Sequence, residues 1–499
     1  MQLQFERQGV PCLYTVKREL QSQEQTQEVR LPEGMPDIGR VLGAWGQVIV
    51  RGKEWGNSTM SLSCGVMAWV LYMPEDGDCV QSVEAWLPFA MKWDLPETRY
   101  DGRILATCLL KSVDARSTSA RKLMVRANLE AVGEAWQETQ AQVAVPGDLP
   151  DDVEVLTASY PVLLPKEAGE KMFQLEETLS LPVNCPKIEK IMYYNIQPEV
   201  LEKKVMAGKV VFRGVGMLHV LYRGEDGGLY TWDYELPFSQ YGDLEGEYDG
   251  EPEVSVHPCV TNLDISQDEN GELLLKAGML GQYLLWDRSM ITVVEDAYSP
   301  RRKMELTREE LTLPAVLDLT VQTVQADTSV QADARQIVDV TFCPRFAEQM
   351  RMDTDMSFSL PGQMQMLYYD SDGMLQCMTA PWEGQWDLPV SESCVVDAKI
   401  IPTGKPQAIP GAGNIGLRGE VSVDAVTTAG QGIPIVTEIE MGELEKPVSN
   451  RPSLILCRVG KRRLWDVAKE CGSTVDIIRQ ANCLQGEPDN NAVLLIPIA

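Results

Sequence analysis

The stretch Leu218-His219-Val220-Leu221-Tyr222, followed by Glu225-Asp226-Gly227 and Leu236-Pro237-Phe238, decides the fold because the chain contains it three times. The other copies are Ala68-Trp69-Val70-Leu71-Tyr72 with Glu75-Asp76-Gly77 and Leu87-Pro88-Phe89, and Met364-Gln365-Met366-Leu367-Tyr368 with Ser371-Asp372-Gly373 and Leu388-Pro389. β-Branched, aromatic and long apolar residues favour a strand. The Asp-Gly pair favours the positive φ angles of a tight primed turn. Each copy is therefore predicted to be a β-hairpin.

One face of the first arm is predicted to be buried, because side chains alternate along a strand. Leu218, Val220 and Tyr222 share this face, and the matching positions in the other copies are Ala68, Val70, Tyr72, Met364, Met366 and Tyr368. The opposite face begins with His219, Trp69 or Gln365, and a position that accepts three such different side chains is not expected to be catalytic. The predicted structural anchors of the repeats are Tyr72, Gly77, Tyr222, Gly227, Tyr368 and Gly373.

Matched spacings extend the repeat beyond the hairpin. Pro32 precedes Val70 by 38 residues, and Pro182 precedes Val220 by the same 38. In the third copy the spacing is longer, 52 residues from Pro314 to Met366. We therefore predict three repeated β-rich domains at 1–148, 149–296 and 297–441, the third diverged, then a linker at 442–452 and a small module at 453–499. The expected fold class is mainly β.

Charge and composition exclude several classes of protein. The net charge of −29 argues against nucleic-acid binding and against anionic membranes, since both need a basic surface. Residues 451–499 hold seven Lys/Arg against five Asp/Glu, a tail of about +2 on an acidic body. We see no apolar run for a secretory signal and none of 18 residues for a membrane span.

The sequence offers little for catalysis or metal binding. The 12 cysteines form no Cys-x-x-Cys pair, which is typical of small buried hydrophobes in a reducing compartment. The two histidines, His219 and His257, stand in strand-like runs and are interpreted as structural. No carboxylate pair stands out for acid–base work. The chain is predicted to have no catalytic residue, metal or cofactor.

The last 45 residues change in pattern. A short strand is expected over 453–459, a helix over 464–471 ending at Gly472, and a second helix after a capping box at Ser473. The stretch 493–497 closes as a strand. This is a β-α-α-β module, and the indole of Trp465 is assigned to its own core because Ala468 follows one helical turn later.

At these residues the module resembles a LysM domain, through Leu464-Trp465-Asp466-Val467-Ala468, Ala481-Asn482-Cys483-Leu484 and Leu494-Leu495-Ile496-Pro497. The three upstream repeats resemble SPOCS domains, so the whole is similar to SipL-type proteins of spore-forming Firmicutes. This resemblance implies spore-coat morphogenesis, a cytoplasmic location on the mother-cell side at the forespore surface, and a coat-basement ATPase as protein partner.

LysM domains bind N-acetylglucosamine-containing glycans through two loops. The residues that stand there in this chain are Lys461, Arg462, Arg463, Leu464, Asn482 and Leu484, and they are the candidate partner- or glycan-binding set. Three cations replace the family's Gly-Asp-Thr turn, which favours an acidic protein surface over a sugar. The hypothesis is a non-enzymatic adaptor, and the alternative is a protein that binds peptidoglycan or chitin-type glycan.

Overall fold

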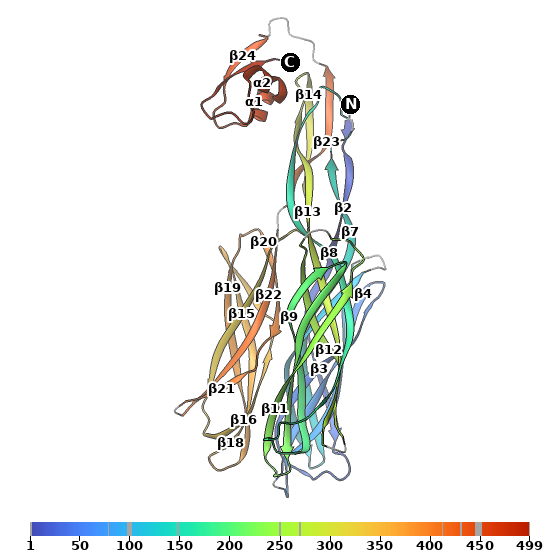
Figure 1. Ribbon diagram of the computed structural model, residues 1–499, viewed down its shortest axis with the longest axis vertical. Helices are drawn as coiled ribbons and strands as arrows, with labels where there is room; N and C mark the ends of the chain where they lie inside the picture. The colour runs from blue at the N-terminus through green and yellow to red at the C-terminus, as the bar shows by residue number, and fades with distance from the viewer. Residues whose placement is uncertain are drawn as a thin grey trace.

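The computed structural model (Figure 1) describes residues 2–77, 79–96, 102–145, 147, 149–248, 251–268, 271–411, 413–429, 432–444 and 452–498. Over these residues the chain is mainly β, and its two helices both lie near the C-terminus. The predicted fold class is confirmed. Strands of up to 26 residues set the overall shape, because several of them run through a broad body and on into a narrow stalk (Figure 1).

The first group of strands forms a two-layered sandwich. It comprises β2 (Glu6–Arg30), β3 (Ile38–Trp55), β4 (Thr59–Pro74), β5 (Gln81–Asp94), β6 (Arg103–Ser119) and β7 (Lys122–Val145). The sheet orders are β2-β7-β6 and β3-β4-β5, all antiparallel. Leu123, Val125 and Leu129 of β7 belong to the same buried cluster as Val66 and Leu87 of the other sheet. Alternating apolar residues on facing strands build this core.

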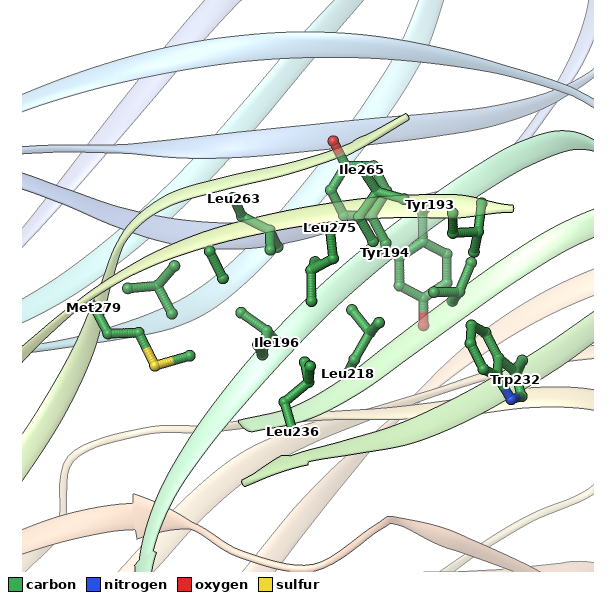
Figure 2. Packing of buried hydrophobic residues seen from close by; sticks show 14 of the residues in the cluster. Tyr193, Tyr194, Ile196, Leu218, Trp232, Leu236, Leu263, Ile265, Leu275 and Met279 are labelled. Carbon is green, nitrogen blue, oxygen red and sulfur yellow. The ribbon is translucent and has the colours of Figure 1, made fainter. Parts of the chain in front are cut away.

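The second group repeats the arrangement. It comprises β8 (Glu154–Leu179), β9 (Ile188–Met206), β10 (Lys209–Gly224), β11 (Leu229–Asp243), β12 (Glu253–Gln267) and β13 (Leu273–Tyr298), in sheets of order β12-β13-β8 and β11-β10-β9. Figure 2 shows side chains from both sheets meeting in its core, with Leu218 beside Ile196 and Leu236, and Leu275 contributed by the opposite sheet.

The third group is divided into more strands. It comprises β14 (Arg302–Leu311), β15 (Val316–Val330), β16 (Ala334–Pro344), β17 (Glu348–Met352), β18 (Asp355–Asp370), β19 (Leu375–Pro389), β20 (Cys394–Pro402), β21 (Gln407–Pro410), β22 (Ile415–Ala429) and β23 (Ile433–Leu444). β18 pairs with β16, β17 and β19, and β22 pairs with β15, β20 and β21. β14 and β23 form a separate sheet with β1 (Gln2–Gln4).

The predicted hairpins are β4–β5, β10–β11 and β18–β19. The face predicted to be buried is buried in every copy: Tyr72 is 0% exposed, Tyr222 is 1% and Tyr368 is 9%. Leu218 and Val220 are 1% and 0% exposed. The domain divisions at 148, 296 and 441 stay predictions, and each falls within three residues of the end of β7, β13 or β23.

The turns differ from the primed turns expected. The N–H of Gly227 donates to the carbonyl of Gly224 at 2.9 Å, and the next pair across the strands is Gly224 with Gly228. Gly227 has φ of +80° and Gly373 has +75°, but no aspartate in the described residues has a positive φ. Gly77 is not in the left-handed region either. In the second and third copies the loop therefore has three residues and needs one left-handed residue, at its end.

Above the body, the stalk is built from pieces of all three groups: the start of β2, the end of β7, the start of β8, the end of β13, and β14 with β23. Its interior holds two apolar clusters, which are Cys12, Val143, Leu164, Ile291, Val293, Leu311, Leu313, Ala315 and Ile435, and then Phe5, Val294, Ala297, Val436, Ile439 and Met441. The three groups therefore share one core there.

The C-terminal module is formed by β24 (Leu454–Arg458), α1 (Leu464–Cys471), α2 (Val475–Asn482) and β25 (Val493–Pro497), in the predicted β-α-α-β order. α1 ends at Gly472, whose φ is 64°. The N-cap of α2 is Thr474, one residue after the predicted Ser473, and its side chain accepts the N–H of Ile477. Of the predicted linker, Gly442 to Leu444 continue β23, and residues 445–451 lie outside the described part of the chain.

We predict that Gly227→Val destabilises the protein by about 1–3 kcal/mol, because a β-branched residue resists a φ of +80°. A side chain at Gly227 would meet no heavy atom within 4 Å, so the loss is conformational and not steric. The matched control is Gly227→Asn, which tolerates the left-handed region and should lose less. Urea unfolding measures both. Equal decreases in the free energy of unfolding for the two variants would contradict the turn geometry.

Candidate functional site

The C-terminal module is seated on the tip of the stalk, at the end of β13 (Figure 1). Asp296 accepts hydrogen bonds from the indole N–H of Trp465 at 2.9 Å and from the ammonium of Lys469 at 2.7 Å. The hydroxyl of Tyr298 donates to the carbonyl of Ser473 at 2.8 Å. The rings of Tyr298 and Trp465 meet edge to face, with centroids 4.8 Å apart. These contacts connect the module to the stalk.

The position of Trp465 differs in part from the sequence assignment. Its side chain is 7% exposed, so it is buried as predicted. However, Tyr298 and Asp296 belong to β13 and supply part of its surroundings, so the indole packs at the junction and not in the module's own core alone. No local pattern around Asp296 or Tyr298 indicates this role, because the contact spans 169 residues of sequence.

The three predicted cations have different surroundings. Arg462 forms an ion pair with Glu470 and donates to the carbonyls of Arg458 and Val459, so it ties the loop to α1. Arg463 lies 3.4 Å from Asp466 and 3.7 Å from Glu295 of the stalk. Lys461 is exposed. The cluster is thus partly engaged with acidic groups of the same chain.

The other predicted loop residues serve the module's own structure. Leu464 is fully buried, and its N–H donates to the carboxylate of Glu487 at 2.8 Å. The amide of Asn482 bonds to the carbonyls of Ile478 and Leu495 and to the N–H of Leu495, joining α2 to β25. Leu484 is half-buried against the module core. Asn482 and Leu464 are therefore engaged before any ligand binds.

The module has an exposed apolar surface that sequence reasoning missed. We name it the outer sheet face: Leu454 and Leu456 of β24 and Val493 and Leu495 of β25, which are 50%, 70%, 58% and 37% exposed. Leu456 stands directly opposite Leu495 in the ladder. Alternate residues of the same strands, such as Leu494 and Ile496, are buried. The strands are apolar on both faces, a signal visible in the sequence run 493–496.

A buried charged cluster joins the three groups of the body. His219 of β10 lies between two carboxylates: its Nδ1 is 2.5 Å from Asp233, and its Nε2 is 3.2 Å from Asp339 of β16. The hydroxyl of Tyr193 donates to Asp339 at 2.7 Å, and Trp45 of β3 stacks on Tyr193. His219 is structural, as the sequence indicates, but it acts between groups.

The pKa of His219 follows from this geometry. Burial alone would lower the pKa, but the charge of Asp339 and the hydrogen bond with Asp233 outweigh burial and raise it to about 9. The imidazolium in turn helps to hold the pKa of Asp339 below its usual range despite the burial of that carboxyl. The cluster is therefore ionised at neutral pH and links the second and third groups.

Comparison with known proteins gives one family. A family model described as the SipL SPOCS domain matches residues 187–267, which run from the start of β9 to the end of β12. Over these residues the chain is similar to that domain. This supports a SipL-type, sporulation-related protein. No curated protein and no solved structure matches the chain.

The described side chains and helices also bear on metal binding and on membrane insertion. In the described part of the chain no three His, Cys, Asp or Glu side chains gather as metal ligands would. Neither of the two described helices has the length and apolar character needed to cross a bilayer. The described features that remain for a functional role are the module, its outer sheet face and the spaces between the strand groups.

We predict that His219 stabilises the fold less as pH rises. Its pKa is raised from 6.5 to about 9, so its contribution is fully present below pH 6.5 and is lost as pH rises through about 9. The difference in unfolding free energy between wild type and His219→Gln should fall by roughly 2 kcal/mol between pH 7 and pH 10. Urea unfolding at both pH values measures it, with His257→Gln as control.

We also predict that Asp296→Ala loosens the module. The carboxylate accepts from Trp465 and Lys469, and hydrogen bonds to a charged group contribute about 1.5–3 kcal/mol each. Hydrogen exchange in α1 should therefore become faster, while exchange in β10 stays unchanged. Asp476→Ala, on the exposed side of α2, is the control. Unchanged exchange in α1 would mean that the stalk contact does not stabilise the module.

Proposed function

We propose that this chain is a non-enzymatic adaptor in spore-envelope morphogenesis, which docks on a protein partner through its LysM-like module and SPOCS-like repeats. The observation that carries the proposal is the match of residues 187–267 to the SipL SPOCS domain. The resemblance of the chain to SipL-type proteins implies a coat-basement ATPase at the forespore surface as the partner. The module's position at the tip of the stalk suits such a role, because it stands clear of the body (Figure 1).

The chemistry of the outer sheet face supports a protein partner. Four aliphatic side chains lie together on a two-stranded sheet, and exposed apolar surface of this kind is typical of protein interaction sites. Arg458 lies at one end of the outer sheet face, opposite Val493. Lys461 follows three residues later and is exposed. An apolar centre with cations at its edge fits a partner surface that has apolar residues bordered by carboxylates.

The same module is poorly equipped for a glycan. Trp465 is the only aromatic residue between positions 451 and 499, and its ring is covered by the stalk. Ligand sites use exposed aromatic faces together with free polar groups. In the two loops Leu464 and Asn482 already have partners within the module. The glycan-binding alternative is therefore kept as an outcome of the test.

We predict that Leu456→Asp on the full chain weakens binding to the purified ATPase by tenfold or more, about the effect of removing a central apolar contact. Leu456 is 70% exposed, so the change leaves the module folded. Lys461→Glu should mainly slow association and reduce its dependence on salt. Val183→Asp is the matched control, because Val183 is an exposed aliphatic residue of the body.

The measurement is calorimetric titration of each variant with the ATPase and, separately, with N-acetylglucosamine oligomers. Binding to the ATPase that survives Leu456→Asp would remove the outer sheet face from the docking surface. Tight glycan binding without ATPase binding would replace the adaptor role by the wall-binding one.

A further inference from the structure

A cavity of about 520 Å³ lies where the three groups of strands meet, below the stalk. Its lining includes Trp136 of the first group, Lys203, His257 and Trp286 of the second, and Val316 and Asp424 of the third. A volume of this size is typical of small-molecule sites. No element of the described chain occupies it, and it is separate from the module and its outer sheet face.

The topology explains why the space stays open. The sheets of the second and third groups are joined by one backbone pairing, Val316 with Leu163. Beyond it β8 pairs with β13, and β15 pairs with β22, so the two sheets part. The cavity is lined by Val316, a member of that pairing, and by Pro165, two residues beyond Leu163 on β8. The stalk holds the three groups of strands together above the cavity, and the space between their sheets remains open below it.

Part of the polar lining is already satisfied. Glu134 lies 3.1 Å from Lys399 and 3.2 Å from Arg18, and Arg18 also pairs with Asp397. These four groups come from β2, β7 and β20 and connect the first group to the third. They form one wall of the cavity and have little capacity left for a ligand.

Three other groups on the lining have unused capacity. His257 is nine-tenths buried, and its Nδ1 has no hydrogen-bond partner among the described residues. Lys203 is exposed and lies 3.9 Å from Asp424, beyond hydrogen-bond range, and among the described residues Asp424 accepts a long bond of 3.4 Å from Ser422. Nδ1 of His257 is itself covered, so His257 lines the cavity through its other atoms.

The protonation states of His257 and Asp424 limit the class of ligand that the cavity could bind. Burial, with the charges of Lys399 and Lys203, holds the pKa of His257 well below its usual range, so the ring is neutral. Burial raises the pKa of Asp424. The lining therefore offers a neutral imidazole, an ammonium and a carboxyl group within one space, which together can both donate and accept.

The balance of charge disfavours an ionic ligand. Three cations line the cavity, Arg18, Lys203 and Lys399, against four carboxylates, Glu134, Glu253, Asp397 and Asp424. An added anion or cation would meet like charges and lose its hydration. Hydroxyl groups donate and accept without bringing charge, and the apolar lining, which includes the half-buried Trp136, suits the C–H faces of a sugar ring. We propose that this cavity binds a neutral saccharide of about two rings, independently of the docking role of the module.

The test is calorimetric titration of the full chain with four neutral disaccharides: maltose, cellobiose, trehalose and N,N′-diacetylchitobiose. At least one should bind with one site per chain, and His257→Leu should weaken that binding about tenfold or more, the effect of one lost buried hydrogen bond. The melting temperature separates this role from a structural one. Leucine removes an unpartnered buried nitrogen, so the variant should melt no lower than wild type.

A matched pair of neighbours on β9 tests the cavity wall. Lys203→Ala should weaken binding, whereas Lys204→Ala, on the other face of the strand, should leave it within about twofold. Val426→Trp places an indole in the cavity and should abolish binding. Failure of all four sugars to bind, or binding that survives His257→Leu and Val426→Trp, overturns the proposal. If N,N′-diacetylchitobiose were the one sugar that still bound to both His257→Leu and Val426→Trp, its binding site would be assigned to the C-terminal module.

Discussion

The antiparallel ladder between β8 and β13 is the constraint on which the rest of the structure depends. It runs from Leu273 opposite Leu179 to Tyr298 opposite Glu154, with register shifts at Leu285/Trp286 and Val294/Asp296. Its lower half forms part of one sheet of the second sandwich, and its upper half forms part of the stalk. Because the pairing continues on both sides of each shift, the same two strands join the body to the stalk. The module is therefore held at a set distance from the body.

Apolar burial and charge have different roles in holding the three groups together. Apolar clusters cross from group to group, as where Trp45 and Trp69 of the first group pack on Tyr193 of the second. Ion pairs cross as well, as with His219 and Asp339, or Glu134 and Lys399. Buried ion pairs contribute little net stability but strongly oppose mispairing, since a misplaced group would leave a charge unpaired. They fit an assembly of three groups of strands that must join in one order.

The sequence predicts the local features well, because hairpins and helix caps depend on neighbours in the chain. The burial of Tyr72, Tyr222 and Tyr368 follows from alternation alone, and the module's element order follows from its periodicity and its cap at Gly472. The primed turns were wrong because Asp-Gly fits both turn families and the loop length decides between them. The stalk, the seat of Trp465 on Asp296 and the central cavity could not be predicted, since they depend on pairings between distant segments.

The location of the unsatisfied groups is the last consequence of this architecture. Three sandwiches that share one stalk must diverge below it, because twisted sheets cannot stay in contact along their whole length. The side chains at the point of divergence come from three different strand groups, so no single hairpin can satisfy them. Glu134 pairs with Lys399 across that gap and with Arg18 on the neighbouring strand, whereas among the described residues Nδ1 of His257 and the ammonium of Lys203 have no comparable partner. The geometry that joins the three groups of strands into one body thus also creates a polar space with hydrogen-bonding capacity for a ligand.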